Sequence, residues 1–533
     1  MQNRTYLWLD LAIENIKKVL RTDLRLEEKL VELIPDSVNA AYEKILAKIP
    51  DDNIPHVQKT LQIIVGARRP LTIAEMAMAL GVATKPRLRK AEQACLPLEG
   101  LGERIRELCG HFVFINNSKI YLIHQTAKEF LTRKSTAEGS NYAFNFEMAA
   151  AERQMAQICI WYLTMDDLGS GPTRNTSKIQ SFLSYSAEHW PDHVRQSSLG
   201  FDPDVESLLY SLYDTTNTRF ELWHPVFWDA VMQYRPMPKW NSLHLAAFNG
   251  HNEMLQKELV GSEARVDELD TTGASALMWA SENGHHEAVK MLLKAGADVN
   301  LPGGYYGNAL QAASYSGHLK VIHTLLDNQA HVNVEGGYFG TALQAAAYKG
   351  NDEAVRALLD GSADVEAQGG LFASALQAAS YNGRVEVVRV LLENGADIHA
   401  QESVYGNVLQ AASYNGQYDM VQMLLDRDAD INAQCGRYGN ALQAACYKGQ
   451  ERVVELLMNR GADANAQGGH FGKALEAAAY SGSEKVLEVL LAHNVDIHDQ
   501  GGRFGGALQA ASYSGEVKMV QILLDKGAKV NGP

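Results

Sequence analysis

The sequence has few cysteines, and their spacing follows no pattern. The five cysteines, Cys95, Cys109, Cys159, Cys435 and Cys446, are odd in number and scattered, and no two form a Cys-x-x-Cys pair. A disulfide framework pairs an even number of cysteines, and a structural zinc site typically uses Cys-x-x-Cys pairs. The sequence therefore argues against both, and we expect a cytoplasmic protein, with the nucleus as the alternative location.

Positive charge is also scarce. The 533 residues include 48 lysines and arginines against 63 aspartates and glutamates, so the formal net charge is −15. Surplus negative charge repels phosphate groups, which disfavours nucleic acid and anionic membrane surfaces as the main partner. The apolar run at residues 6–13 is short and contains Asp10, so it predicts neither a signal sequence nor a membrane span.

The sequence also lacks a phosphate-binding loop that ends in Lys-Ser or Lys-Thr. The nearest stretch, Gly468 to Ala474, is one residue too short between its outer glycines and has Ala474 where the metal-binding hydroxyl belongs. His285, His286 and Glu287, with His318 one unit further on, are too sparse to predict a metal site. No nucleophile, base and orienting group stand at informative spacing. We expect no catalytic residues, no metal, no cofactor and no enzyme activity.

Repetition is what this sequence has in abundance. The pentad Ala-Leu-Gln-Ala-Ala, or a close variant, recurs every 33 residues. Its leucines are Leu310, Leu343, Leu376, Leu409, Leu442, Leu475 and Leu508, and looser copies lie at Leu243 and Leu277. The sequence therefore predicts about nine structural units of the same design.

Each unit has the same internal order. A first helix of small residues ends at a glycine, the residue type that most readily adopts the left-handed turn that closes a helix. These glycines are Gly250, Gly284, Gly317, Gly350, Gly383, Gly416, Gly449, Gly482 and Gly515. A second helix then presents an aliphatic face, as with Val385, Val388 and Leu391, and a glycine-rich hairpin such as residues 336–340 completes the unit.

This order of elements resembles the ankyrin repeat family from Trp240 to Pro533. The usual Thr-Pro-Leu-His of that family is replaced by forms such as Asn308-Ala309-Leu310-Gln311, which alters the expected hydrogen bonds but not the architecture. The resemblance implies an all-α dominated fold that contains a solenoid of about nine repeats. It also implies a concave groove that binds a protein partner.

Three further segments precede the repeats. Residues 1–50 predict amphipathic helices. Residues 51–135 predict a winged-helix domain. A capping box at Thr72 to Glu75 opens a helix that ends at Gly81, and a second helix spans residues 98–109. A hairpin then turns at residues 116–118, and Thr126 caps a further helix. Residues 136–239 predict a helical linker domain that caps the repeats through Trp223, Phe227, Trp228 and Trp240.

The segments before the repeats resemble fungal STAND proteins of the NACHT type, without their nucleotide-binding core. The resemblance rests on residues 6–9, 42–46, 122–131 and 182–190. It implies that His124 is sensor-like for nucleotide phosphate. Because the chain lacks the nucleotide core, we favour the alternative, a histidine that only forms a hydrogen bond at the strand end. It also implies an accessory role in a fungal gene cluster, including secondary metabolism. The alternatives are a winged-helix DNA-associated regulator that uses Lys85, Arg87, Arg89 and Lys90, or a truncated STAND receptor that acts with a separate ATPase.

Two rows of aromatic residues run through the repeats. A tyrosine stands two residues before the turn glycine in seven successive units: Tyr315, Tyr348, Tyr381, Tyr414, Tyr447, Tyr480 and Tyr513. These are our candidate protein-binding residues, because this position resembles those that line the ankyrin groove. We expect no self-stacked ladder, since neighbouring helices lie about 8 to 10 Å apart while ring pairs favour roughly 4.5 to 7 Å. The alternative is that each ring packs on its neighbour's helix. A second row is expected to staple hairpin to hairpin: Tyr306, Phe339, Phe372, Tyr405, Tyr438, Phe471 and Phe504.

Overall fold

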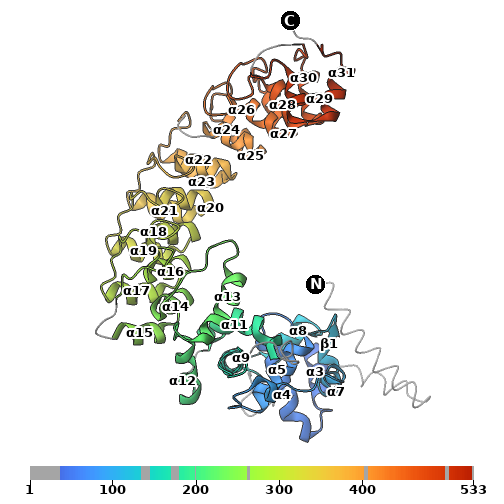
Figure 1. Cartoon of the computed structure of the whole chain (residues 1–533), viewed down its shortest axis with the longest axis vertical. Helices are drawn as coiled ribbons and strands as arrows, with labels where there is room; N and C mark the ends of the chain where they lie inside the picture. Colours follow the sequence, from blue (N-terminus) through green and yellow to red (C-terminus); the bar gives the residue numbers. More distant parts are fainter. Residues whose placement is uncertain are drawn as a thin grey trace, which may run out of the picture. The chain divides into compact units, whose positions relative to one another are not determined.

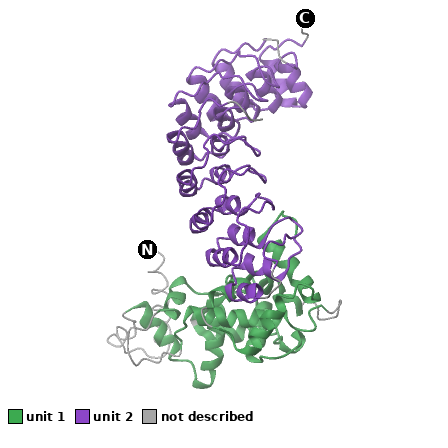
Figure 2. Cartoon of the chain, turned by 90° about the vertical axis from the view of Figure 1, so that its left-hand side faces the viewer, with its two compact units in different colours: residues 1–237 green, residues 238–533 purple. Residues whose placement is uncertain are grey.

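A computed structural model describes residues 37–133, 144–169, 179–197, 200–260, 265–400, 406–498 and 503–530, except the side chain of His111. The chain divides into two compact units, residues 1–237 and residues 238–533 (Figure 2). The second unit begins two residues before the predicted start of the repeats. The first unit contains the segments predicted at residues 1–50 and 51–135, and all but the last two residues of the segment predicted at 136–239. Most of the predicted helical segment 1–50 lies outside the described residues.

The described part of the first unit is helical, with a single hairpin (Figure 1). Its elements are α3 (Val38–Leu46), η1 (Asp51–Asn53), α4 (Ile54–Gly66), α5 (Ile73–Thr84), α6 (Ala91–Ala94), α7 (Leu101–Cys109), η2 (Gly110–Phe112), β1 (Val113–Asn116), β2 (Lys119–Leu122), α8 (Gln125–Leu131), α9 (Met148–Leu163), η3 (Gln180–Phe182), α11 (Leu183–Gln196), α12 (Pro203–Leu212) and α13 (Thr218–Val231). The order from α4 to α8, helices followed by a hairpin and a helix, is that of the predicted winged helix.

The predicted capping box is present at the start of α5. The Thr72 side chain accepts from the Glu75 backbone amide, and the Glu75 carboxylate accepts from the Thr72 amide. The predicted end at Gly81 is wrong, because α5 continues to Thr84. Gly81 instead permits close packing, since a Cβ there would lie 1.8 Å from the carbonyl oxygen of Ala94. This glycine is a contact point inside the helix rather than its end.

The hairpin pairs β1 and β2 antiparallel, with Asn116 opposite Lys119. Asn117 and Ser118 form the two-residue turn and both have positive φ, 47° and 58°, as a type I′ turn requires. The predicted cap of the next helix is wrong, because α8 begins at Gln125 and its N-cap is His124 rather than Thr126.

The second unit is a stack of helix pairs in sequence order (Figure 1). Its described residues form nine pairs, which confirms the predicted repeats. The pairs are α14 (Ser242–Asn249) with α15 (Asn252–Val260), α16 (Ala276–Glu282) with α17 (His286–Lys294), α18 (Ala309–Ser316) with α19 (Leu319–Asp327), α20 (Ala342–Lys349) with α21 (Asp352–Asp360), α22 (Ala375–Tyr381) with α23 (Val385–Glu393), α24 (Val408–Tyr414) with α25 (Tyr418–Leu425), α26 (Ala441–Tyr447) with α27 (Glu451–Asn459), α28 (Ala474–Ser481) with α29 (Glu484–Ala492), and α30 (Ala507–Ser514) with α31 (Val517–Asp525).

The turn glycine of each pair has positive φ, as predicted, with values from 67° to 84°. A side chain from the next repeat lies beneath this turn and bonds the preceding carbonyls. The Nε2 atoms of His285 and His318 lie 2.9 Å and 3.1 Å from the carbonyl oxygens of Phe248 and Glu282. Asn351 makes the equivalent bond to Tyr315. The two histidines therefore connect adjacent repeats.

A buried glutamine performs the second connection between repeats. The Gln344 side-chain amide donates to the carbonyl oxygens of Ala373 and Gly369 in the next hairpin, at 2.6 Å and 3.0 Å, and its oxygen accepts from the Thr341 amide at 2.7 Å. Gln311, Gln377, Gln410 and Gln443 bond the next hairpin in the same way. In the first repeat His244 contacts the Glu268 carbonyl at 3.0 Å. Glutamine thus makes the bond to the next hairpin that histidine makes in the first repeat, and the architecture of the repeats is unchanged.

We predict that Gln344→Ala lowers the free energy of unfolding of the repeats by about 1 to 3 kcal/mol, because it leaves buried hairpin carbonyls without a donor. Urea denaturation followed by circular dichroism measures the loss, and hydrogen exchange should place it at residues 367–373. Gln422→Ala is the matched control, because Gln422 is exposed on α25. Equal stability of the two variants would contradict the proposed connection.

Candidate protein-binding surface

The two aromatic rows of the repeats form one continuous ladder. Five hairpin rings lie between the tyrosine of their own repeat and that of the repeat before it: Phe339, Phe372, Tyr438, Phe471 and Phe504. The ring centroid of Phe339 is 4.9 Å from those of both Tyr315 and Tyr348. That of Phe471 is 4.7 Å from Tyr447 and 5.1 Å from Tyr480. The spacing suits favourable ring pairs, so the ladder stabilises the contact between neighbouring repeats.

The expectation that the tyrosines do not stack on one another is wrong. The rings of Tyr381 and Tyr414 are 6.5 Å apart, those of Tyr414 and Tyr447 are 6.3 Å apart, and the pairs continue to Tyr513 at similar distances. That expectation compared the distance between helix axes with the distance between ring centroids, and the two differ here. The rings project beyond the helices and converge, and the hairpin rings fill the space between them. Stacking contacts between hairpin rings are present as well, for example 6.3 Å between Phe471 and Phe504. Tyr405 lies outside the described residues.

The rows differ in exposure. The hairpin rings are buried, with Phe339 and Phe471 each 3% exposed. The tyrosines are partly buried, except Tyr513, which is 71% exposed in the last repeat. Tyr315 and Tyr414 carry a lysine over the ring, with Lys349 and Lys448 at 4.7 Å and 4.8 Å from the ring centroids, a contact that orients an ammonium over an aromatic face.

A third row, which the sequence analysis missed, flanks the ladder. We call it the tip row, the residue before each hairpin aromatic; its described members are Tyr305, Tyr338, Leu371, Arg437, His470 and Arg503. The signal is present in the sequence, because this position varies widely from unit to unit while the residue after it is always tyrosine or phenylalanine.

Backbone bonds hold the tip row in line. The amides of Tyr338 and Leu371 donate to the carbonyls of Tyr305 and Tyr338, and the His470 amide donates to the Arg437 carbonyl at 2.7 Å. Tyr305, Tyr338 and Leu371 are 46%, 45% and 41% exposed. Tyrosine row, hairpin row and tip row together form what we call the aromatic face. This face exposes large side chains on a rigid support.

His124, the predicted nucleotide sensor, is occupied as a helix cap. Its Nδ1 accepts from the backbone amide of Thr126 at 3.2 Å and lies 3.1 Å from the Thr126 hydroxyl. That hydroxyl is 3.0 Å from the hydroxyl of Tyr42 on α3. This histidine thus lies beside the strand end and links α8 to α3.

Arg87, one of the basic residues behind the DNA-binding alternative, pairs with Asp204 at 2.6 Å. Part of the positive charge of that loop is therefore already neutralised within the first unit.

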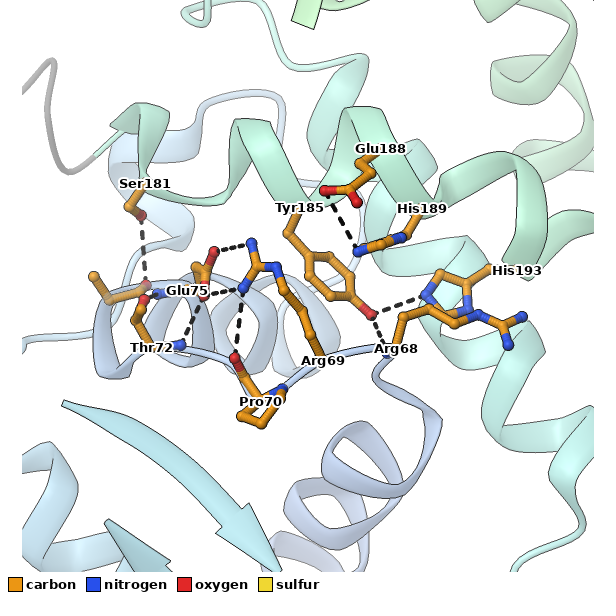
Figure 3. A network of polar contacts seen from close by, with 11 residues as sticks. Arg68, Arg69, Pro70, Thr72, Glu75, Ser181, Tyr185, Glu188, His189 and His193 are labelled. Atoms are coloured by element: carbon orange, nitrogen blue, oxygen red, sulfur yellow. Dashed lines mark hydrogen bonds and ion pairs between the residues drawn. The ribbon is translucent and has the colours of Figure 1, made fainter. Parts of the chain in front are cut away.

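A buried polar network joins the winged helix to the helices that follow it (Figure 3). The Tyr185 hydroxyl of α11 accepts from the backbone amide of Arg68 and lies 3.0 Å from Nε2 of His193. The Nδ1 of His193 is 2.6 Å from the Glu152 carboxylate of α9, which also accepts from the Arg68 side chain. This network connects three elements, because Arg68 lies between α4 and α5.

Hydroxyl, imidazole and carboxylate in this order resemble the relay that activates a nucleophile. Tyr185 and His193 are fully buried, however, so no substrate reaches the hydroxyl. Burial raises the pKa of Tyr185 well above its usual value, which opposes formation of the nucleophilic anion. Burial also lowers the pKa of His193, although the bond to Glu152 works against this shift. The network is therefore suited to connecting helices rather than to catalysis.

Arg69 completes the same junction. Its guanidinium binds the Glu75 carboxylate with two hydrogen bonds, at 2.7 Å and 3.0 Å, and lies 5.1 Å from the centre of the Tyr185 ring (Figure 3). The segment 182–190, singled out in the sequence by its resemblance alone, thus contributes the tyrosine on which the junction is built. Nothing in the spacing of these residues indicated that they meet.

The predicted capping tryptophans lie in both units. Trp223 of α13 packs on Trp190 at 5.4 Å within the first unit. Trp240 packs on Trp279 at 5.6 Å at the start of the repeats, and both indole N–H groups donate to the carboxylate of Asp270. Trp240 thus covers the beginning of the stack from inside the second unit.

Comparison with known proteins identifies families along both units. Ankyrin repeat models match residues 243–336, 309–402, 408–501 and 475–531. Residues 53–145 match the model described as GPI inositol-deacylase, winged helix domain. Among the described residues, no helix has both the length and the apolar character needed to cross a bilayer.

Two fungal proteins are similar to parts of the chain. The azaphilone pigments biosynthesis cluster protein L of Monascus ruber is 30% identical over 294 residues, which cover 50% of this chain and 60% of that protein. The vegetative incompatibility protein HET-E-1 of Podospora anserina is 26% identical over 168 residues, 30% of this chain and 11% of that protein. The chain therefore spans less than two thirds of either relative. The crystal structure of the human ASB11 ankyrin repeat domain is 28% identical, covers 42% of this chain and 99% of its own, and has a TM-score of 0.38.

We predict that Tyr447→Ala lowers the free energy of unfolding of α26 and α28 by about 2 to 3 kcal/mol, because it removes a ring from the ladder. Tyr447→Phe keeps the ring and should lose less than about 1 kcal/mol. Tyr513→Ala is the matched control, because that ring is mostly exposed. Hydrogen exchange of the two helices measures the loss. If Tyr447→Ala destabilises but leaves partner binding unchanged, the tyrosine row is structural only.

We also predict that acid weakens the first unit through His189 of α11. Burial, followed by the charges of His193 and Arg69, lowers the pKa of His189 from 6.5 to about 4. Between these values the unfolded chain binds a proton that the folded chain does not, so this contribution to stability is complete above pH 6.5 and is lost as the pH falls toward 4.

His189→Gln should therefore reduce the difference in α11 protection between pH 7 and pH 5. Hydrogen exchange, corrected for the intrinsic effect of pH on exchange, measures that difference. His493→Gln, on the exposed surface of the second unit, should leave it unchanged. An identical pH response of wild type and His189→Gln would show that this histidine does not carry the effect.

Proposed function

Because residues 243–531 belong to the ankyrin-repeat family, we propose that the chain is a non-enzymatic interaction protein whose aromatic face binds another protein. One observation carries the proposal: the ladder of rings holds a row of exposed, variable side chains in line across successive repeats. Exposed tyrosine and arginine on a rigid support are the side chains that dominate protein interfaces. A partner would gain contact area without the loss of conformational freedom that flexible loops suffer on binding.

The setting we propose is a fungal secondary-metabolite gene cluster. The similarity to the pigment cluster protein of Monascus ruber supports this, since it extends over half of the chain. The partner would then be another protein of the cluster, and the interaction would serve regulation rather than chemistry. The winged-helix match and the STAND resemblance support a regulatory stem for the first unit.

The test compares two double variants of the tagged full chain in fungal cells. Tyr338→Ala with Leu371→Ala removes exposed side chains from the tip row. Val385→Ala with Val517→Ala is the matched control, because these exposed apolar residues lie on the second helices α23 and α31. Quantitative affinity capture should show proteins that are lost at least about tenfold with the tip-row variant and retained with the control.

The opposite result would overturn the proposal. If both variants capture the same proteins in the same amounts, and circular dichroism shows that both are folded, the aromatic face is not the binding surface. Turnover of a metabolite or a nucleoside triphosphate by the purified chain would overturn the non-enzymatic role.

A further inference from the structure

We propose that the aromatic face recognises an extended protein segment with two chemically different halves, apolar or aromatic toward the first repeats and acidic toward the last. The inference rests on the proposed function, because it specifies the partner of the same surface. It follows from the change in chemistry along the tip row, whose first three described members are uncharged and whose last three are basic or titratable.

The first half of the tip row offers an apolar platform. The rings of Tyr305 and Tyr338 stack at 5.4 Å with an angle of 15° between their planes, and Leu371 continues the line. Each of these three side chains is more than two fifths exposed. Together they form a row of exposed apolar surface to which apolar or aromatic side chains of a partner can bind.

The second half offers positive charge. Arg437 and Arg503 are exposed, and a guanidinium nitrogen of Arg503 lies 3.1 Å from both ring nitrogens of His470. The guanidinium carbon of Arg503 also lies over the ring of Phe504, 5.9 Å from its centroid. Carboxylates on a partner would meet these cations with charge-assisted hydrogen bonds.

The acidity of the whole chain sharpens this recognition. The formal net charge is −15, so an acidic segment is repelled by most of the molecule and attracted to this cluster of cations. Complementary charge of this kind fixes the register of a partner more than it raises affinity. We therefore expect the acidic half of the segment to bind in one direction along the array.

His470 gives the contact a dependence on pH. Burial, together with the charges of Arg503 and Arg437 that face it, lowers the pKa of His470 from its usual value. Carboxylates of an acidic partner would favour the protonated imidazole and raise the pKa of His470 again. Binding would then be coupled to the uptake of a proton by His470. The affinity for an acidic segment should therefore increase as the pH falls below 7, and a His470→Gln variant should lose this increase.

Single-stranded nucleic acid also combines negative charge with flat rings, but the ladder suits it poorly. Bases stack on open aromatic faces, whereas the rings here lie 4.7 to 5.5 Å from their neighbours across the two rows. No space remains between successive rings for a base. The negative net charge of the chain opposes such binding as well.

The experiment selects random twelve-residue peptides displayed on phage with the purified full chain. We expect enriched peptides with aspartate and glutamate clustered at one end and apolar residues at the other. Arg437→Glu with Arg503→Glu should weaken binding of a selected synthetic peptide at least about tenfold, since it places like charges together. Lys320→Glu with Lys518→Glu is the matched control, because these exposed lysines on α19 and α31 undergo the same change of charge. The control should stay within about twofold, as expected for exposed rim charges.

Three outcomes would overturn the inference: no enriched peptides, enriched peptides without an acidic end, or equal loss of affinity in both charge variants. Tight binding of a fluorescent twenty-nucleotide oligothymidine at the same face would show that the ligand of this face is nucleic acid and not a protein segment. These failures are distinguishable from failure of the proposed function. If the tip-row variant still loses its cellular partners while selected peptides show no acidic end, the surface binds protein but not the segment we describe.

Discussion

The fold of the repeats depends on hydrogen-bond donors for the buried backbone carbonyls of the hairpins. The described hairpins of the repeats have only isolated bridges between their own strands, so most of these donors must come from elsewhere. In five of the described repeats a glutamine of the first helix supplies the missing donor to the hairpin of the next repeat. Because the donor and the acceptors belong to different repeats, the bond fixes the distance and rotation between neighbours. The regular alignment of the aromatic rows follows from that geometry, since rings one repeat apart can meet only if the repeats are held in register.

The sequence predicted the features that arise from local chemistry. The turn glycines, the capping box of α5 and the two-residue hairpin were predicted because each depends on residues a few positions apart. The His124 cap was missed although it bonds the amide of Thr126 only two positions away. The packing role of Gly81 and the ring pairs were missed or mistaken because each depends on groups that meet only after folding. The network around Tyr185 belongs to the same group: Arg68 and Tyr185 are 117 positions apart, and nothing in the spacing relates them. The tip row is different, because its variation is visible in the sequence itself.

The two units solve the problem of joining helices in different ways. In the first, a buried network of tyrosine, histidine, glutamate and arginine connects the winged helix to α9 and α11. Each member is satisfied only while the others remain in place, so the junction is intolerant of change. In the second, each contact is one of several similar ones, and the loss of one leaves the others intact. We therefore expect variation to be better tolerated along the repeats than at the junction.

The sameness of the contacts between successive repeats has an evolutionary consequence. Most of the units offer the same glutamine, glycine and aromatic ring to the unit that follows. Unequal recombination between gene copies could thus add or delete whole units without creating a new packing problem, and lengthen or shorten the surface by one step. Point mutation at the tip row could then diversify what each added step recognises. A gene built this way can follow a changing partner faster than one whose core must be rebuilt at each substitution.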